Sequence, residues 1–347
     1  MSGERLPDIR SLSREEIGLF LSGHNEKPFR SGQVYDWLWK RSCGSFDEMT
    51  NLPASLRHLL KEHFTFYKAT AEHRQESSDG AVKIGFRLFD DSMVEGVLIP
   101  SGERATACIS SQAGCALGCK FCATGKLGFT RNLTAGEIFD QVTMLASLQH
   151  KLSNIVYMGM GEPFLNYEAV VESVEKITSP EGLGMSPQRI TISSIGIPKM
   201  IRRMADDNPK FHFALSLHAA ADEKRNMIIP FNLKHPLAEI SDALKYYHTV
   251  TGKRFTIEYI LFGNFNDSLA DAKSLALFCR NFPVKINLIE YNPVKDTGYT
   301  IPDPGKTQMF MAFLESKNMV VNLRKSRGKE IDAACGQLAA KQLRMNN

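Results

Sequence analysis

The chain has 347 residues, which is enough for one large domain with a small appendage or for two domains. Hydrophobic residues at 43% and charged residues at 23% describe an ordinary globular protein, and a formal net charge of +4 allows an anionic partner without requiring one. The N-terminus has no apolar leader and no run is long enough to span a membrane, so we expect a cytoplasmic protein without membrane contact. Seven cysteines in such a chain favour metal binding or catalysis over a disulfide scaffold.

The first 65 residues have the pattern of a helical module. Ser13 and Glu16 have the spacing of a capping box, an apolar pattern follows over residues 34–39, and a third helix is predicted to run toward Phe64. Both tryptophans lie in the basic and aromatic segment KPFRSGQVYDWLWKR. Their packing in a small core is the simpler interpretation, and a nucleic-acid contact surface is the alternative. We assign residues 1–65 to a helical accessory domain that is a candidate for RNA binding.

From about residue 66 to residue 100 the pattern changes to strands. KIGFRLF and MVEGVLIP are the two predicted strands, separated by polar turns such as SSDG. We interpret residues 66–100 as a β-rich bridge to the main domain.

Beyond residue 100, strands and helices alternate regularly. The predicted strands are TACISS, NIVYMGM, RITISS, FHFALSLH, FTIEYILF, KINLIEYN and MVVNLR. The predicted helices between them run from Thr134 to Leu148, Tyr167 to Ile177, Lys199 to Ala205, Pro236 to Thr249, Leu269 to Phe282 and Lys306 to Ser316. Repeated units of this kind imply parallel strands with right-handed crossovers. We therefore predict an α/β fold with a partial (βα)6 barrel of the TIM type over residues 101–340, and a site at the C-terminal ends of its strands.

Three cysteines follow the first strand of this barrel. Cys115, Cys119 and Cys122 have the spacing C-x3-C-x2-C. Thiolates hold iron–sulfur clusters, and three ligands on one loop can bind three corners of a cubane and leave the fourth iron open for a substrate. A zinc site normally has four protein ligands, so zinc is the weaker alternative.

Polar and glycine residues follow the other strands. The second strand ends in GMGEP, where Gly159 and Gly161 permit close backbone approach to a ligand. Polar residues end the third, fourth and sixth strands: Ser193, the run Ser216, Leu217 and His218, and Asn292. For any single one, a hydrogen-bonded loop residue is an equal interpretation, but together they favour a site.

A second cysteine motif, EIDAACGQL, follows the last predicted strand. Its Cys335 lies on a loop of small residues and can return to the mouth of the barrel. A late cysteine is by default an inert buried residue. Cys108, however, also lies near the cluster triplet without a place in it, so both cysteines are candidates for a second kind of chemistry.

The cysteine triplet in this position, with Phe121 before its last member, resembles the signature of the radical S-adenosylmethionine (SAM) superfamily. The resemblance implies a [4Fe–4S] cluster held by Cys115, Cys119 and Cys122, whose open iron binds SAM and promotes its cleavage to a 5′-deoxyadenosyl radical. The SAM contacts that it implies are Gly161, Glu162, Ser193, Ser216, Leu217, His218 and Asn292.

Cys108, the triplet, GMGEP and DIDAACGQL together resemble the RlmN/Cfr family of RNA adenosine methyltransferases, over nearly the whole chain. The resemblance implies that one SAM methylates Cys335 and that a second SAM yields the radical that activates this methyl group for addition to adenine. Glu95 matches the proton acceptor of the family. Cys108 then resolves the protein–RNA adduct and forms a transient disulfide with Cys335.

Within this family, SSQAGCALGC and GMGEPFLN are more similar to the RlmN branch. That branch implies methylation of C2 of an adenosine in the peptidyl transferase region of 23S rRNA, and of adenosine 37 in tRNAs. The alternative is the Cfr branch, which modifies C8 and confers antibiotic resistance. A rival of another class is a non-catalytic RNA-binding protein with a zinc or structural cluster.

The expected partners are 23S rRNA, tRNA and an external electron donor of the flavodoxin or ferredoxin kind, and we expect a monomer. RNA contacts are predicted for the N-terminal basic segment and for the tail cations Arg324, Lys325, Arg327 and Lys329.

Overall fold

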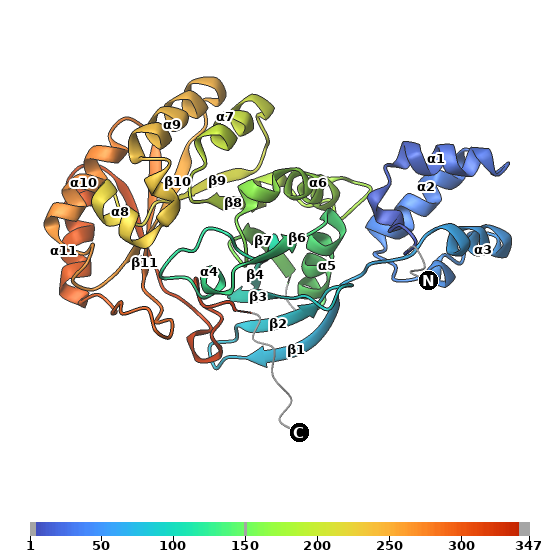
Figure 1. The fold of residues 1–347 in the computed structure, drawn as a ribbon, viewed down its shortest axis with the longest axis horizontal. Helices are drawn as coiled ribbons and strands as arrows, with labels where there is room; N and C mark the ends of the chain where they lie inside the picture. Colours follow the sequence, from blue (N-terminus) through green and yellow to red (C-terminus); the bar gives the residue numbers. More distant parts are fainter. Residues whose placement is uncertain (1–4, 149–150, 340–347) are drawn as a thin grey trace.

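A curved, ten-stranded sheet runs through most of the molecule in the computed structural model, which describes residues 5–148 and 151–339 (Figure 1). The strand order is β1-β2-β3-β4-β7-β8-β9-β10-β11-β12. These strands are β1 (Thr70–Glu76), β2 (Val82–Arg87), β3 (Met93–Ser101), β4 (Arg104–Cys108), β7 (Lys151–Tyr157), β8 (Ile190–Ser194), β9 (His212–Ser216), β10 (Phe255–Leu261), β11 (Val284–Glu290) and β12 (Val320–Arg324). A two-stranded hairpin adds β5 (Gln112–Gly114) and β6 (Phe129–Asn132).

Parallel pairing joins every neighbour from β4 to β12. The helices between these strands are α4 (Ala123–Leu127), α5 (Ala135–Ala146), α6 (Tyr167–Thr178), α7 (Pro198–Asp207), α8 (Asp222–Ile228), α9 (Leu237–Thr251), α10 (Leu269–Cys279) and α11 (Pro304–Glu315). Figure 1 shows most of them along the outer side of the sheet. Because β1 and β12 stand at opposite ends of the strand order, the barrel is partial. The predicted α/β fold is confirmed.

The predicted bridge strands are β2 and β3, and they continue the barrel sheet. Antiparallel pairing links β1 through β4, with Val97 opposite Cys108. The sequence reading missed β1, because all its residues are exposed and leave no apolar alternation. The division into residues 1–65, 66–100 and 101–340 stays a prediction, and residues 1–4 and 340 lie outside the described residues.

The N-terminal module contains α1 (Arg14–Gly23), α2 (Phe29–Tyr35) and α3 (Ala54–His63). Ser13 and Glu16 form the predicted capping box of α1. Trp39 is fully buried and packs edge-on against Phe139 of α5, with ring centroids 5.2 Å apart. The ring nitrogen of the half-buried Trp37 donates to a side chain of the same module. The tryptophans therefore help to form the core, as the simpler interpretation of the sequence predicted.

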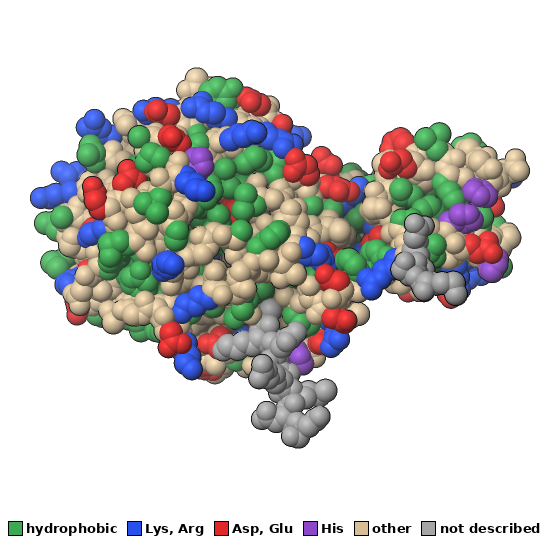
Figure 2. All heavy atoms as spheres, viewed as in Figure 1, with side chains coloured by type: hydrophobic (Ala, Val, Ile, Leu, Met, Phe, Trp, Pro, Cys, Tyr) green, Lys and Arg blue, Asp and Glu red, His purple; other side chains and the backbone are tan. Residues whose placement is uncertain are grey.

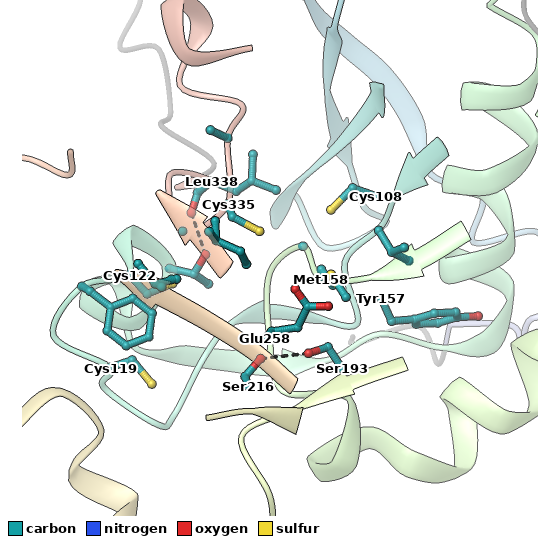
Figure 3. A pocket seen from close by; sticks show the side chains of 18 of the residues that line it. Cys108, Cys119, Cys122, Tyr157, Met158, Ser193, Ser216, Glu258, Cys335 and Leu338 are labelled. Atoms are coloured by element: carbon teal, nitrogen blue, oxygen red, sulfur yellow. Dashed lines mark hydrogen bonds between the residues drawn. The ribbon is translucent and has the colours of Figure 1, made fainter. Parts of the chain in front are cut away.

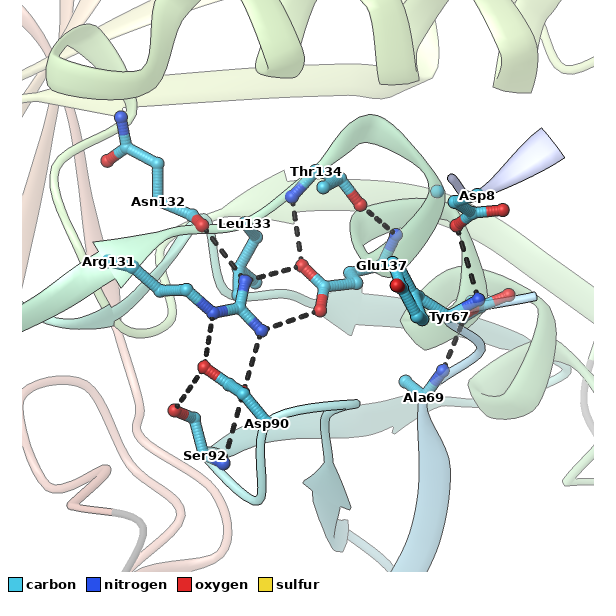
Figure 4. Close-up of polar contacts among 12 residues, drawn as sticks. Asp8, Tyr67, Ala69, Asp90, Ser92, Arg131, Asn132, Leu133, Thr134 and Glu137 are labelled. Carbon is cyan, nitrogen blue, oxygen red and sulfur yellow. Dashed lines mark hydrogen bonds and ion pairs between the residues drawn. The ribbon is translucent and has the colours of Figure 1, made fainter. Parts of the chain in front are cut away.

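Buried ion pairs join this module and the strand layer to α5. Arg10 donates to Asp140 at 2.8 Å, and Asp140 also accepts the amide of Ala69 at 2.9 Å. Farther along, Arg131 of β6 bridges Asp90 and the buried Glu137 (Figure 4). These contacts fix the hairpin β5–β6 beside the mouth of the barrel.

Acidic and basic side chains are interspersed over the barrel face seen in Figure 2. The small net positive charge is thus not gathered into one patch on this face. None of the helices in the described part of the chain combines the length and apolar character needed to span a bilayer.

Candidate active site

A cavity opens at the C-terminal ends of the parallel strands, where a barrel of this type carries its chemistry (Figure 3). Its lining includes the three cysteines of the predicted cluster motif and the two further candidate cysteines: Cys115, Cys119, Cys122, Cys108 and Cys335. It also includes five of the predicted SAM contacts: Gly161, Glu162, Ser193, Ser216 and His218. The fold thus brings together residues that are far apart in the sequence.

The cluster loop lies between the two strands of the small hairpin. The amide of Cys115 donates to the carbonyl of Gly128 at 2.8 Å and closes the loop at its base. At the other end, the amide of Ala123 donates to the carbonyl of Gly336 at 2.7 Å. This second bond ties the cluster loop to the segment that carries Cys335.

Two thiols of this loop lie where burial disfavours their charged form unless a cationic group binds. Burial raises the pKa of Cys115 to about 12 and the pKa of Cys119 well above its ordinary value, and neighbouring thiols add to both shifts. A bound metal stabilises thiolates and reverses this effect. Within residues 5–148 and 151–339, no three His, Cys, Asp or Glu side chains are arranged to hold one metal ion. Three thiols spread along one loop at the wall of a shared cavity fit the corners of an iron–sulfur cluster.

Cys108 and Cys335 line the same cavity as the cluster loop. Cys108 is the last residue of β4, and Figure 3 shows its sulfur and that of Cys335 turned toward the space between them. Burial, followed by the charge of Cys335, raises the pKa of Cys108 to about 12. Burial also raises the pKa of Cys335, whereas Arg324 opposes the shift at both thiols. All seven cysteines are free thiols in this structure.

Glu162 holds the adjacent strand ends together. One carboxylate oxygen accepts the amide of Phe164 at 3.0 Å and the other accepts the amide of Ile195 at 3.1 Å. Burial raises the pKa of Glu162 to about 7, although these hydrogen bonds oppose the shift. Its side chain therefore connects the end of β7 to the end of β8 as well as lining the cavity.

The glycines beside Glu162 allow close packing of neighbouring backbone. A Cβ on Gly159 would lie 2.7 Å from the carbonyl carbon of Ile109, and one on Gly161 would lie 2.5 Å from the Cβ of Gln112. Gly161 also has a φ of 98°, which side chains other than glycine rarely adopt. These glycines thus allow approach of the neighbouring strand end. Both also line the cavity, and their close approach to a ligand stays a prediction.

His218 presents a neutral ring to the cavity. Burial, followed by the charge of Arg225, lowers the pKa of His218 to about 3. Its Nδ1 accepts the amide of Ile260 at 3.1 Å, so the ring proton is on Nε2. Ser193 and Ser216 share a hydrogen bond of 2.8 Å at the neighbouring strand ends. Together they supply hydroxyl and imidazole groups for a polar ligand.

Family models match two parts of the chain. The ribosomal RNA large subunit methyltransferase N-terminal domain matches residues 7–66, and the radical SAM superfamily matches residues 109–276. The chain is 48% identical over 343 residues to a protein of Christiangramia forsetii named as a dual-specificity RNA methyltransferase RlmN, and the match covers 97% of each. The chain belongs to the RlmN family of radical SAM RNA methyltransferases. This membership implies SAM and a [4Fe–4S] cluster as cofactors.

A further relative and one solved structure also match nearly the whole chain. A relative of the same name from Cytophaga hutchinsonii is 50% identical, with 97% of this chain and 93% of the relative covered. The crystal structure of a radical SAM methyltransferase from Sphaerobacter thermophilus superposes with a TM-score of 0.90 at 37% identity, over 96% of this chain and all of the other.

Three residues expected from the resemblance to the RlmN family lie outside the cavity lining. Leu217 is a fully buried core residue whose carbonyl accepts from Arg225. The amide nitrogen of Asn292 donates to Ser326, and its buried Oδ1 has no partner among the described residues, which leaves an acceptor for a ligand. Glu95 on β3 accepts the amide of Ala339 at 2.9 Å, close behind the Cys335 loop.

The sequence assigned Arg324 of this RlmN family member to RNA contact, but the structure pairs it internally. Its guanidinium donates to the buried Glu258 of β10 at 3.0 Å, and both residues line the cavity. Arg327 likewise donates to a backbone carbonyl, and Lys329 pairs with Glu290. Glu258 was not among the predicted site residues. Its position as the one carboxylate within the apolar strand FTIEYILF could have indicated a functional role.

Proposed function

We propose that this enzyme methylates C2 of an adenosine in the peptidyl transferase region of 23S rRNA and of adenosine 37 in tRNAs. The proposal rests on one observation above all: Cys335 and Cys108 line the same cavity as the three cluster thiols. Relatives named as dual-specificity RNA methyltransferases support two kinds of RNA substrate. The target adenine has to leave its stack to enter such a cavity.

Cys335 is the proposed methyl carrier. As a thiolate it attacks the methyl group of SAM, which leaves as S-adenosylhomocysteine. Arg324 supports this step, because it opposes the rise in the pKa of Cys335 caused by burial. The hydrogen bond between Ala123 and Gly336 supports a fixed distance between this carrier and the cluster loop.

The cofactors, when bound, supply a 5′-deoxyadenosyl radical that removes a hydrogen atom from the S-methyl group. The carbon carried by Cys335 then joins the adenine, which gives one electron back to the cofactors and its ring proton to Glu95. Glu95 is supported by its place on β3, next to the β4 strand that ends in Cys108, and by Lys83, whose ammonium lies 3.5 Å from its carboxylate.

Cys108 is the proposed resolving thiol. As a thiolate it attacks the sulfur of Cys335, a disulfide forms, and the bond from Cys335 to the RNA-bound carbon breaks. The electron pair of that bond stays with the carbon, which takes up a proton and becomes the methyl group. The disulfide then needs a reducing thiol before the next turnover. Cys108 is buried and Cys335 is half-buried, which limits access of solvent thiols to the exchange.

Nucleoside mass spectrometry tests the proposal. Ribosomal RNA and tRNA from cells with and without the gene are digested, and 2-methyladenosine is separated from 8-methyladenosine. We expect the 2-methyl isomer in both RNAs only when the gene is present. The 8-methyl isomer would instead assign the Cfr-type reaction, and methylation confined to rRNA would remove tRNA from the proposal.

A further inference from the structure

Arg225 of α8 is a fully buried cation whose hydrogen-bond partners are all uncharged. Its Nε donates to the carbonyl of Leu217 at 3.0 Å, and one Nη donates to Oδ1 of Asn232 at 2.5 Å. The other Nη donates to the carbonyls of Ile195 at 2.5 Å and Ser216 at 3.5 Å. A guanidinium buried in this way keeps its hydrogen bonds, but none of its partners within residues 5–148 and 151–339 is a carboxylate.

An acidic side chain of the same helix, Asp222, is engaged by other hydrogen bonds. Asp222 accepts the amide nitrogen of Asn232 at 2.7 Å and the backbone amide of Leu237 at 2.9 Å, so it reaches Arg225 only through Asn232. Burial lowers the pKa of Arg225 to about 10, because Cys119 and Asp222 offset the loss of hydration only in part. Arg225 therefore brings a positive charge into the interior that its own hydrogen-bond partners do not neutralise.

The cluster loop adjoins this positive site. The amide of Lys120 donates to the carbonyl of Ile228, the last residue of α8, at 2.9 Å. Cys119 belongs to the same buried apolar cluster as Ile228 and Ile229. Arg225 lies one helical turn before Ile228 on α8, and this turn places it close to the cluster loop. A buried cation and a buried cluster ligand thus share one water-poor region, where electrostatic effects are strong.

We propose that Arg225 is a positioning residue that favours the reduced state of the iron–sulfur cluster, an inference that rests on the proposed function. With three thiolates, a [4Fe–4S] cluster carries one negative charge when oxidised and two when it has taken one electron from the external donor. A fixed positive charge stabilises the second state more than the first. The hydrogen bonds from Arg225 to the carbonyls at the ends of β8 and β9 hold that charge in place near the cluster loop.

Potentiometric titration of the reconstituted holoenzyme, followed by the EPR signal of the reduced cluster, tests this inference. Arg225→Gln removes the charge, Arg225→Lys keeps it, and Asn232→Asp leaves the arginine in place but adds a carboxylate against it. We expect the Gln and Asp variants to hold about tenfold less reduced cluster at a given potential, which is a shift of about 59 mV to more negative values for one electron. The Lys variant should stay near the parent.

Each result decides between charge and simple structural support. Equal potentials in the parent, Arg225→Gln and Asn232→Asp would overturn the proposal, as would an equal shift in Arg225→Lys and Arg225→Gln. If Arg225→Gln and Asn232→Asp fold, by their thermal unfolding, but lose iron that Arg225→Lys keeps, the charge requirement is supported. Loss of iron in all three variants would overturn it. A parent protein that binds no iron would instead refute the proposed function.

Discussion

Gly159 offers a sharp test of how the site is built, because its replacement by alanine adds one methyl group at the end of β7. The new Cβ would lie 2.7 Å from both the carbonyl carbon and the oxygen of Ile109, and equally close to Oγ of Ser110. Two of these three atoms are backbone and cannot rotate away. The strand ends therefore have to separate by several tenths of an ångström, which costs about 1–3 kcal/mol.

The same displacement affects chemistry, because Ile109 directly follows Cys108. The amide of Gly159 donates to the carbonyl of Ile109 at 3.0 Å, so a shift at one is passed to the other. We expect Gly159→Ala to slow release of the protein–RNA adduct, which needs Cys108, more than it slows methylation of Cys335.

Urea unfolding followed by circular dichroism measures the first effect, and denaturing gels of enzyme with RNA measure the second. Gly252→Ala is the matched control: Gly252 ends α9 in the left-handed region, and its Cβ would meet open space. That control should lose about 1–2 kcal/mol from backbone strain alone and keep adduct release unchanged. Parental stability and adduct release in Gly159→Ala would refute the packing account.

Three further predictions address the thiols and the hairpin. Cys108→Ala should accumulate covalent RNA–enzyme adduct on denaturing gels, and free methylated RNA released at the parental rate would contradict a resolving role. Because burial raises the pKa of Cys335 above its ordinary value, the rate of methyl transfer from SAM to this thiol should rise about tenfold per pH unit below that pKa. Peptide mass spectrometry after timed quenching from pH 6 to pH 8 measures this rate. A rate that does not change with pH would be inconsistent with thiolate attack. Arg131→Met removes the ion pair of the buried Glu137, in which the two side chains are 2.8 Å apart. The free energy of unfolding should therefore fall by about 2–4 kcal/mol, and by less in Arg131→Lys. Unfolding of Arg131→Met at the parental urea concentration would show that this pair does not stabilise the hairpin.

Periodicity in the sequence was sufficient to predict the parallel part of the fold. Apolar runs such as FTIEYILF and amphipathic helices alternate strictly there, so β10 and its neighbours could be assigned from pattern alone. β1 could not, because an edge strand with every residue exposed carries no burial signal.

The site was predictable where one loop contains it and less so where distant residues meet. The spacing of Cys115, Cys119 and Cys122 predicts cluster binding from the sequence alone. Arg324 and Glu258, in contrast, come into contact only because β12 and β10 belong to one sheet. The place of Arg324 in a basic tail segment indicated RNA contact, because its hydrogen bond to the buried Glu258 cannot be predicted from the order of residues in the chain.

The methyl group on Cys335 gives the most direct test of the central claim. Reconstituted enzyme is incubated with SAM carrying a deuterated methyl group, and the peptide containing Cys335 is analysed by mass spectrometry before and after RNA is added. We expect the label to appear first on Cys335. After RNA is added, it should appear in the methyl group of adenosine as a deuterated methylene unit. Labelled RNA from enzyme whose Cys335 never carries the label, or full methylation by Cys335→Ala, would contradict it.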